Sequence, residues 1–247
     1  MISPQFLRRA ARSMLRKVAR AINPPHPDQT LGNISYAQHG EDIVLLGVFK
    51  QLDIQHPRYL DIGAHHPIHI SNTALLYEHG GRGVNVEANP NLIDAFYDLR
   101  PEDVTLNVAV GATPGELNFY FIDDYSGRNT CDLQVAQDFV SKYPEFKIQR
   151  TTRVPVETVR NIYDKYFSPN EIDLLSLDVE GMDYEILSSA FHSKVFPKVV
   201  VVEIVCGGDN SQADQMRHLL EQNGYFIHVR LGANYVGVRN EFRHHLA

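Results

Sequence analysis

Residues 60–64 read Leu60-Asp61-Ile62-Gly63-Ala64, a short run that is mostly apolar, carries an acid and ends in a glycine turn. A second run, residues 83–87, ends in Glu87, 24 residues after Gly63. A strand, a glycine turn, a helix and a second strand with a terminal carboxylate form the layout with which open sheets hold a nucleoside. The glycine lets backbone approach the ligand, and the carboxylate accepts the ribose hydroxyls. We therefore expect Asp61, Gly63 and Glu87 to bind a nucleoside.

The glycine turn lacks the further glycines of a dinucleotide site, because Gly63 is followed by Ala64-His65-His66-Pro67. Without the GxGxxG pattern there is no obvious site for a pyrophosphate at the first helix. An NAD-dependent oxidoreductase is therefore kept only as the alternative enzyme.

From about residue 34 onward, short apolar runs alternate with helical stretches, which is typical of an α/β fold with a doubly wound, mostly parallel sheet. Near-continuous apolar runs indicate central strands that are covered on both faces. The last two strands are close enough to form an antiparallel hairpin. The expected helices cover residues 41–52, 71–79 and 91–99, and the expected strands 59–62, 83–87, 104–110, 116–122, 173–178, 198–205, 226–230 and 235–238.

The segment between residues 123 and 150 is polar and irregular, and we predict a lid or substrate loop there. Within it, residues 125–130 are either a plain surface loop or a contact with the substrate. Residues 153–159 form a short extended piece, and Pro155 favours an edge position for it because proline cannot donate to a neighbouring strand.

The composition is that of an ordinary globular protein, with 247 residues, 43% hydrophobic and 21% charged. This length suits one α/β domain. The two cysteines, Cys131 and Cys206, provide neither a disulfide framework nor a CxxC metal site, so we expect a reduced, cytoplasmic protein. No apolar run reaches the roughly 18 residues of a membrane span.

Charge is distributed unevenly along the chain. Residues 1–27 carry six basic side chains and no acid, which leaves 17 basic and 30 acidic residues, a balance of −13, for the remainder. The acidic charge of residues 28–247 argues against nucleic acid as a partner, because attraction to phosphate supplies most of the affinity of a protein for nucleic acid.

The basic N-terminal segment has apolar residues at helical spacing, and the proline-rich stretch 23–27 then breaks the helix. We assign residues 1–33 to a leader and linker and residues 34–247 to the folded domain. Residues 1–22 are a solvated leader, an organellar transit peptide, or a surface that docks to an anionic membrane or a partner protein. Docking would place the protein at the inner surface of the membrane.

Acidic residues gather where two late strands end. Asp178 and Glu180 follow the strand at 173–178, and Glu203 lies near the end of the next strand. Carboxylates at one sheet edge can act as a general base or bind a divalent cation, so all three are candidate metal ligands. Acids in the first turn of a helix are also common for structural reasons.

Two other groups are candidates with strong structural alternatives. Gln38 and Glu41 lie around a glycine turn and could reach a ligand above the first strand, although acids also open helices. The run from His65 and His66 to His69 does not match familiar zinc spacing. His66 or His65 could serve as a base, because imidazole titrates near neutrality.

Together these segments resemble the FkbM-type family of S-adenosylmethionine-dependent methyltransferases. The matching pieces are residues 38–42, 59–67, 71–73, 83–90, 173–181 and 201–203. The resemblance implies a Rossmann-like class I methyltransferase fold, S-adenosyl-L-methionine as cofactor, and methyl transfer to a hydroxyl of a sugar or polyketide-like acceptor. A non-catalytic methyltransferase-like binding module, docked through the basic N-terminus, is the alternative from a different class. The acceptor and the oligomeric state do not follow from the resemblance.

The candidate site residues fall into two groups. The expected cofactor-binding residues are Gln38, Glu41, Asp61, Gly63, Ala64, Glu87, Asn89 and Ala109, and the expected catalytic residues are Asp178, Glu180 and His66.

Overall fold

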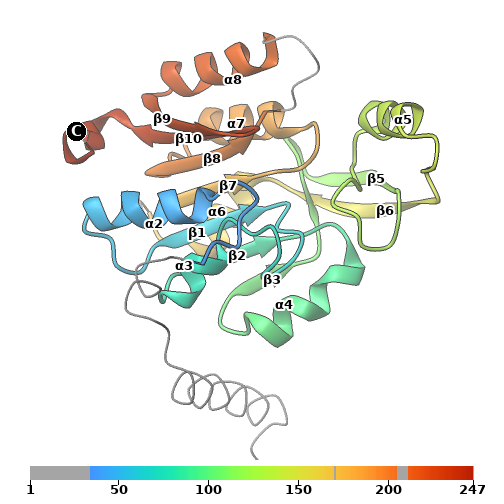
Figure 1. Ribbon diagram of the computed structural model, residues 1–247, viewed down its shortest axis with the longest axis horizontal. Helices are drawn as coiled ribbons and strands as arrows, with labels where there is room; N and C mark the ends of the chain where they lie inside the picture. The colour runs from blue at the N-terminus through green and yellow to red at the C-terminus, as the bar shows by residue number, and fades with distance from the viewer. Residues whose placement is uncertain (1–33, 170, 205–210, 247) are drawn as a thin grey trace, which may run out of the picture. The chain divides into compact units, whose positions relative to one another are not determined.

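The fold is described from a computed structural model, in residues 34–169, 171–204 and 211–246 (Figure 1). Tyr36–Ala247 forms one compact unit, and the N-terminal unit lies almost entirely outside the described residues. The predictions for residues 1–33 therefore remain predictions. Within the described ranges, no helix is long and apolar enough to cross a membrane.

A seven-stranded sheet in the order β3-β2-β1-β7-β8-β10-β9 forms the centre of the compact unit. Neighbouring strands from β3 to β8 pair in parallel, whereas β10 is antiparallel to both of its neighbours. This confirms the predicted α/β fold with a mostly parallel sheet and a C-terminal antiparallel hairpin. The strands are β1 (Arg58–Ile62), β2 (Arg82–Val86), β3 (Val104–Leu106), β7 (Leu174–Leu177), β8 (Val199–Glu203), β9 (Tyr225–Leu231) and β10 (Asn234–Arg239).

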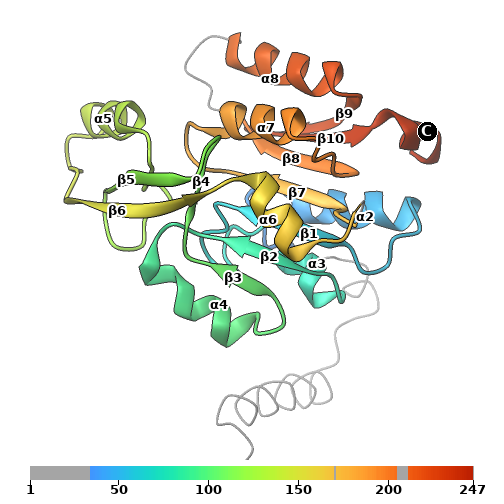
Figure 2. The ribbon, with the colours of Figure 1, turned by 180° about the vertical axis from the view of Figure 1, so that it is seen from behind.

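Helices cover both faces of this sheet, as Figures 1 and 2 show from opposite sides. Successive valines of β8 alternate between two separate apolar clusters: Val199 and Val201 pack in one, Val200 and Val202 in the other. The period of two along a strand explains why each run had to be apolar throughout. The helices are α2 (Glu41–Gln51), α3 (Ala74–Glu78), α4 (Ile93–Leu99), α6 (Val159–Tyr166), α7 (Asp183–His192) and α8 (Ser211–Gln222), with short 3₁₀ turns at Pro90–Leu92 and Asn240–His245.

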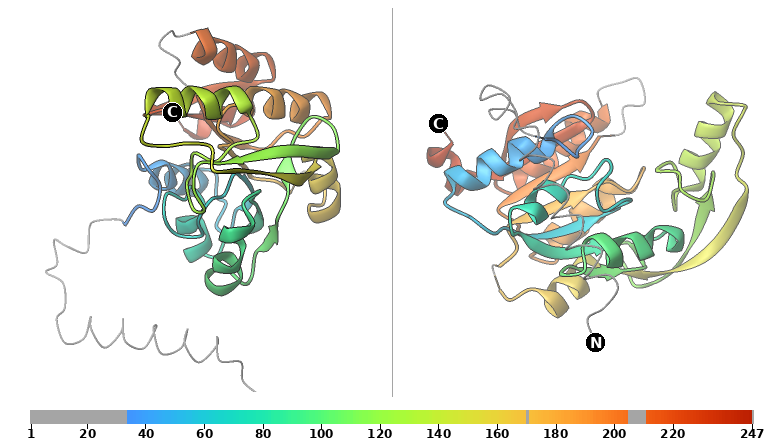
Figure 3. Two further views of the ribbon diagram at one scale, coloured as in Figure 1. Left: turned by 90° about the vertical axis from the view of Figure 1, so that its right-hand side faces the viewer. Right: turned by 60° about the horizontal axis from the view of Figure 1, so that its bottom comes forward.

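A second, three-stranded sheet extends beside the main one (Figures 1 and 3). It contains β4 (Ala109–Val110), β5 (Gly115–Phe121) and β6 (Arg150–Glu157) in the order β4-β6-β5. The single strand predicted over residues 104–110 is therefore wrong. The chain leaves the main sheet after Leu106 and joins the small sheet at Ala109.

Two further expectations need correction. The segment 123–150 is not irregular throughout, because it contains helix α5 (Leu133–Lys142), whose N-terminus is capped by the Asp132 side chain. The strand with Pro155 is central in the small sheet rather than at its edge. Proline is tolerated there because β4 pairs with β6 only at Val156 and Glu157, which leaves one side of Pro155 unpaired.

Candidate active site

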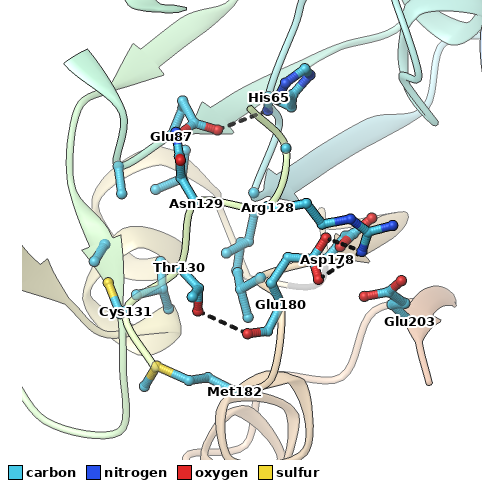
Figure 4. Close-up of a pocket in the computed structure, with 18 of the residues that line it drawn as sticks. His65, Glu87, Arg128, Asn129, Thr130, Cys131, Asp178, Glu180, Met182 and Glu203 are labelled. Atoms are coloured by element: carbon cyan, nitrogen blue, oxygen red, sulfur yellow. Dashed lines mark hydrogen bonds and ion pairs between the residues drawn. The ribbon is translucent and has the colours of Figure 1, made fainter. Parts of the chain in front are cut away.

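A cavity of ≈ 410 Å³ lies at the carboxyl ends of the parallel strands. The chain runs from β1 outward to β2 and β3 and then returns to β7 on the other side of β1. Open α/β sheets bind ligands at such a switch point, because the loops on either side diverge there. Residues at or just past the carboxyl ends of β1, β2, β7 and β8 line the cavity, and the loop at 126–131 lies along its side (Figure 4).

Glu87 forms one end of the cavity and is almost completely buried, with 7% of its surface exposed. Its Oε2 accepts a hydrogen bond from the backbone N–H of His65 (2.9 Å), and its Oε1 accepts one from the N–H of Asn89 (2.6 Å). Burial raises the pKa of Glu87, and these two backbone donors oppose the rise. The carboxylate is thus held in one orientation and still has lone pairs for a ligand.

Gly63 also lines the cavity, but its glycine identity has a second cause. Its φ of +76° is in the left-handed region, and a Cβ atom here would overlap the carbonyl oxygen of Asp178 and lie 2.7 Å from its carbonyl carbon. The sequence interpretation, in which the glycine makes room for a ligand, missed this contact. Glycine here lets the ends of β1 and β7 touch.

Asp61 is buried, and it does not line the cavity. Its Oδ2 accepts a hydrogen bond from the Thr73 hydroxyl (2.5 Å), and a second hydrogen bond comes from the Ser176 side chain. Burial raises the pKa of Asp61, while the positive charge of Arg100 opposes the rise. The structure therefore places this acid among side chains of the protein rather than at the cavity surface.

The other predicted cofactor residues divide in the same way. Gln38 and Ala109 line the cavity, whereas Glu41, Ala64 and Asn89 do not. Glu41 is buried and accepts hydrogen bonds from the His39 N–H and the Asn234 side chain, so it joins the start of α2 to the C-terminal hairpin. The Asn89 side chain caps the turn at Asn91 and donates to the carbonyl of Asp124.

The acidic group predicted at the ends of β7 and β8 also lines the cavity, on the side away from Glu87 (Figure 4). Asp178, Glu180 and Glu203 each offer a carboxylate oxygen, and these oxygens lie within 4.8 Å of one another. Burial raises the pKa of Glu203 to about 7, and the nearby negative charges add to this. The pKa of Asp178 is raised well above its ordinary value by burial and by the charges of Glu203 and Glu180.

Arg128 supplies a positive charge to this acidic group. Its Nη1 donates to both carboxylate oxygens of Glu180, at 2.9 and 3.1 Å. Burial raises the pKa of Glu180, and Arg128 opposes the rise. The Thr130 hydroxyl also donates to the backbone carbonyl of Glu180, so two residues of the loop hold this one turn (Figure 4).

Strained backbone is found at the cavity wall. His65, Ile70 and Glu180 are non-glycine residues with φ between +50° and +55°, and all three line the cavity. This conformation costs about 1–3 kcal/mol and persists where the surroundings enforce it, most often at functional sites. At Glu180 the enforcement includes Asp183, whose carboxylate accepts the N–H groups of Val179 and Gly181.

Of the two adjacent histidines, His65 lines the cavity and His66 does not. Nδ1 of His66 accepts the N–H groups of Ile68 and His69, both at 3.0 Å, which orders the turn. Nε2 of His65 lies 3.1 Å from the carbonyl oxygen of Tyr125 in the loop. The position of His66 gives no support to the predicted role as a base.

Sequence reasoning missed most of the wall formed by the small sheet and its loop. Val108, Phe119, Asn129 and Cys131 line the cavity there, and the side-chain oxygen of Asn129 accepts the N–H of Ile122. Burial raises the pKa of the Cys131 thiol to about 12. The polar run at residues 125–130 was the feature of the sequence that could have indicated this wall. It has no helical or strand periodicity, so its position in the fold could not be deduced.

The comparisons with known proteins give a family and two structures. A family model described as the Methyltransferase FkbM domain matches residues 61–227. No curated protein matches the chain. One solved structure, a methyltransferase FkbM from Methylobacillus flagellatus KT, is 11% identical with a TM-score of 0.47, over 74% of this chain and 44% of that one. A precorrin-6y C5,15-methyltransferase from Geobacter metallireducens GS-15 is 13% identical with a TM-score of 0.40, over 83% and 90%.

This chain therefore spans less than half the length of the Methylobacillus protein. The family model, in contrast, covers about two thirds of this chain and includes Gly63, Glu87 and the acidic group. The chain belongs to the FkbM methyltransferase family.

Proposed function

We propose that this protein is an S-adenosylmethionine-dependent O-methyltransferase that acts on a hydroxyl group of a small-molecule or glycan acceptor. The observation that carries the proposal is that the Glu87 carboxylate and the acidic group of Asp178, Glu180 and Glu203 lie in one cavity. One end suits a nucleoside, and the other suits a proton or a positive charge. Family membership favours methyl transfer over the hydride transfer of the alternative oxidoreductase.

The residues present fit this cofactor. A cavity of ≈ 410 Å³ is within the range of small-molecule sites, about 300–1,000 Å³. Glu87 is a fixed acceptor for a pair of ribose hydroxyls, and the apolar wall at Val108, Ala109 and Phe119 suits an adenine ring. Gly63 and Gln38 line the same cavity. We propose these residues as the cofactor contacts, and we assign Asp61, Ala64, Asn89 and Glu41 to supporting positions behind them.

When bound, the cofactor supplies an electrophilic methyl group on a positively charged sulfur. An alcohol is a weak nucleophile until it loses its proton, so the chain has to provide a proton acceptor or hold a cation that does the same work. A base is most effective when its pKa is near the working pH, and the pKa of Asp178 is raised in that direction. Asp178 is our proposed proton acceptor, with Glu180 fixed beside it by Arg128.

The same carboxylates could instead hold a divalent cation, since oxygen ligands at this spacing suit Mg²⁺. Calorimetric titration of the protein with Mg²⁺ separates the two roles. Binding that disappears in Glu203→Gln and in Asp178→Asn assigns the cation role. No heat at millimolar Mg²⁺, together with turnover that is insensitive to EDTA, assigns the proton-acceptor role.

Methyl transfer itself is tested with S-adenosylmethionine that carries a labelled methyl group and a panel of monosaccharides and hydroxylated polyketide fragments. We expect the label in an alkali-stable ether of one acceptor class. Label in an alkali-labile ester would overturn the hydroxyl acceptor in favour of a carboxylate, and label on nitrogen would overturn the O-methyl assignment itself. Cofactor binding without transfer to any acceptor would favour the non-catalytic binding module.

For the N-terminal segment we keep the proposal that residues 1–22 dock to an anionic membrane surface or a partner protein, on the strength of its basic, acid-free sequence. Sedimentation with anionic vesicles, with and without residues 1–27, is the corresponding measurement. Equal sedimentation of both forms would contradict membrane docking.

A further inference from the structure

We propose that Arg100 is a positioning residue of this site. It acts through Thr73 on Asp61 and thereby fixes the cavity floor, the part of the cavity surface formed by Gly63 at the end of β1. The proposal rests on the proposed function, because it is tested by the binding of S-adenosylhomocysteine, the product that S-adenosylmethionine becomes after methyl transfer. Neither Arg100 nor Thr73 nor Asp61 lines the cavity, so none of them is expected to touch the ligand.

Arg100 directly follows α4 and is completely buried, with 0% of its surface exposed. Its Nε donates to Oδ2 of Asp103 (2.9 Å), and its Nη2 donates to the Tyr59 hydroxyl (2.8 Å). Asp103 is itself fixed by β2, since its Oδ1 accepts the N–H of Gly83 and its Oδ2 accepts the side chain of Asn85. A buried guanidinium must be paired on each side, and its planar geometry then holds its partners rigidly.

The remaining arm of Arg100 points to the end of β1. Its Nη1 donates to the hydroxyl oxygen of Thr73 (2.9 Å), and the Thr73 hydroxyl donates to Oδ2 of Asp61 (2.5 Å). The Thr73 hydroxyl has a single proton, so with Arg100 as its donor that proton must point to Asp61. Arg100 therefore sets the direction of the hydrogen bond that holds the carboxylate.

Asp61 connects the two strands that meet at the cavity. It is paired in register with Ser176 of β7, and the Ser176 side chain also bonds to the carboxylate. Gly63 and Asp178 directly follow the two strands, two positions after Asp61 and Ser176, and their backbones are in direct contact. The buried chain of contacts from Arg100 thus ends one layer below the cavity floor.

The charges in this region also indicate that Asp61 depends on Arg100. Two acids, Asp61 and Asp103, lie around one guanidinium in this buried region. Removal of the Thr73 hydroxyl leaves the Asp61 carboxylate without a donor that is oriented by Arg100. We expect the end of β1 to shift, and with it the cavity floor at Gly63.

The test is calorimetric binding of S-adenosylhomocysteine to Thr73→Val, which keeps the side-chain volume but removes the hydroxyl, and to Thr73→Ser, which restores it. We expect affinity to fall about fivefold or more in the valine variant and to stay within about twofold in the serine variant, since one hydrogen bond to a charged group is at stake. Lysine cannot reach all the partners of Arg100, so Arg100→Lys should show the same fall in affinity. It replaces Thr73→Val if the valine variant does not fold.

Tyr225→Phe is the matched control, because it removes another buried hydroxyl, which donates to the Pro197 carbonyl (2.6 Å) in a different part of the sheet. We expect it to lose stability but to bind S-adenosylhomocysteine as the wild type does. A folded Thr73→Val or Arg100→Lys variant with wild-type affinity would overturn the positioning role while leaving the proposed function intact. A wild-type protein that does not bind S-adenosylhomocysteine would overturn both.

Discussion

A Cβ atom at position 63 would overlap the backbone carbonyl oxygen of Asp178, so Gly63 and Asp178 approach one another more closely than a residue with a side chain at position 63 would permit. Gly63 directly follows β1 and donates its N–H to the carbonyl of Val86, next to Glu87, whereas Asp178 begins the acidic group. The contact therefore fixes the two halves of the cavity relative to each other. A glycine that would be assigned to ligand binding from sequence also sets the geometry between two strands.

Gly63→Ala should lower the free energy of unfolding by more than the cost of placing an alanine at a positive φ. Gly224 is the matched control, because its φ is +85°, close to the +76° of Gly63, and a Cβ atom added there would meet no atom within 4 Å. We expect Gly224→Ala to lower the free energy of unfolding by about 1–2 kcal/mol. Gly63→Ala should lower it by about 1–3 kcal/mol more, because backbone must move. Urea denaturation measures both, and equal losses would contradict the contact.

Glu87→Gln should weaken binding of S-adenosylhomocysteine by about tenfold to a hundredfold. The amide keeps one acceptor oxygen but loses the charge and one of the two oxygens that receive backbone N–H groups. Glu116→Gln is the control, since Glu116 lies on β5 in a surface ion pair with Arg153. Calorimetry that finds wild-type affinity in Glu87→Gln would remove Glu87 from the cofactor site.

Asp178→Asn should reduce methyl transfer by at least about a hundredfold while cofactor affinity stays within severalfold, because an amide cannot act as a general base. The pKa of Asp178 is raised by burial and by its acidic neighbours, so turnover of the wild type should increase with pH above the range in which an ordinary aspartate titrates, as the carboxylate forms. Initial rates with labelled cofactor test both statements. Turnover close to that of the wild type in Asp178→Asn would show that another group takes the proton.

We expect Glu203 to make the stability of the protein depend on pH. Burial raises its pKa from 4.5 to about 7 in the folded state. Between these values the folded protein retains a proton that the unfolded chain has already released, so the free energy of unfolding falls as the pH rises through this window. Glu203→Gln has no such proton and should lose less stability between about pH 5 and pH 8. The same pH dependence in urea denaturation of both proteins would show that Glu203 titrates normally.

The strands and the acids at their ends could be predicted because buried parallel strands leave a local signal, a near-continuous apolar run. Apolar runs mark β1, β7 and β8, and their carboxyl ends share one edge of the sheet, so Glu87, Asp178 and Glu203 could be placed together in advance. Which way a side chain points was harder to predict. Successive side chains of a strand point to opposite faces of the sheet, and the side chain of Asp61 lies in a buried hydrogen-bond network rather than at the cavity.

The small sheet could not be predicted, since its pairing depends on contacts distant in sequence. β5 pairs with β6 across the whole of α5, and β4 has only two residues. Nothing in a short run such as Ala109–Val110 shows that it leaves one sheet for another. The role of Arg128 was hidden for the same reason, because its partner Glu180 lies 52 residues further along the chain.

Binding calorimetry of the wild-type protein with S-adenosylmethionine, S-adenosylhomocysteine and NAD tests the central claim most directly. We predict micromolar dissociation constants for the first two ligands, no heat for NAD, and binding of S-adenosylhomocysteine that is about tenfold to a hundredfold weaker in Glu87→Gln. Binding of NAD alone would contradict the account, because the cavity would then serve a dinucleotide rather than a methyl donor.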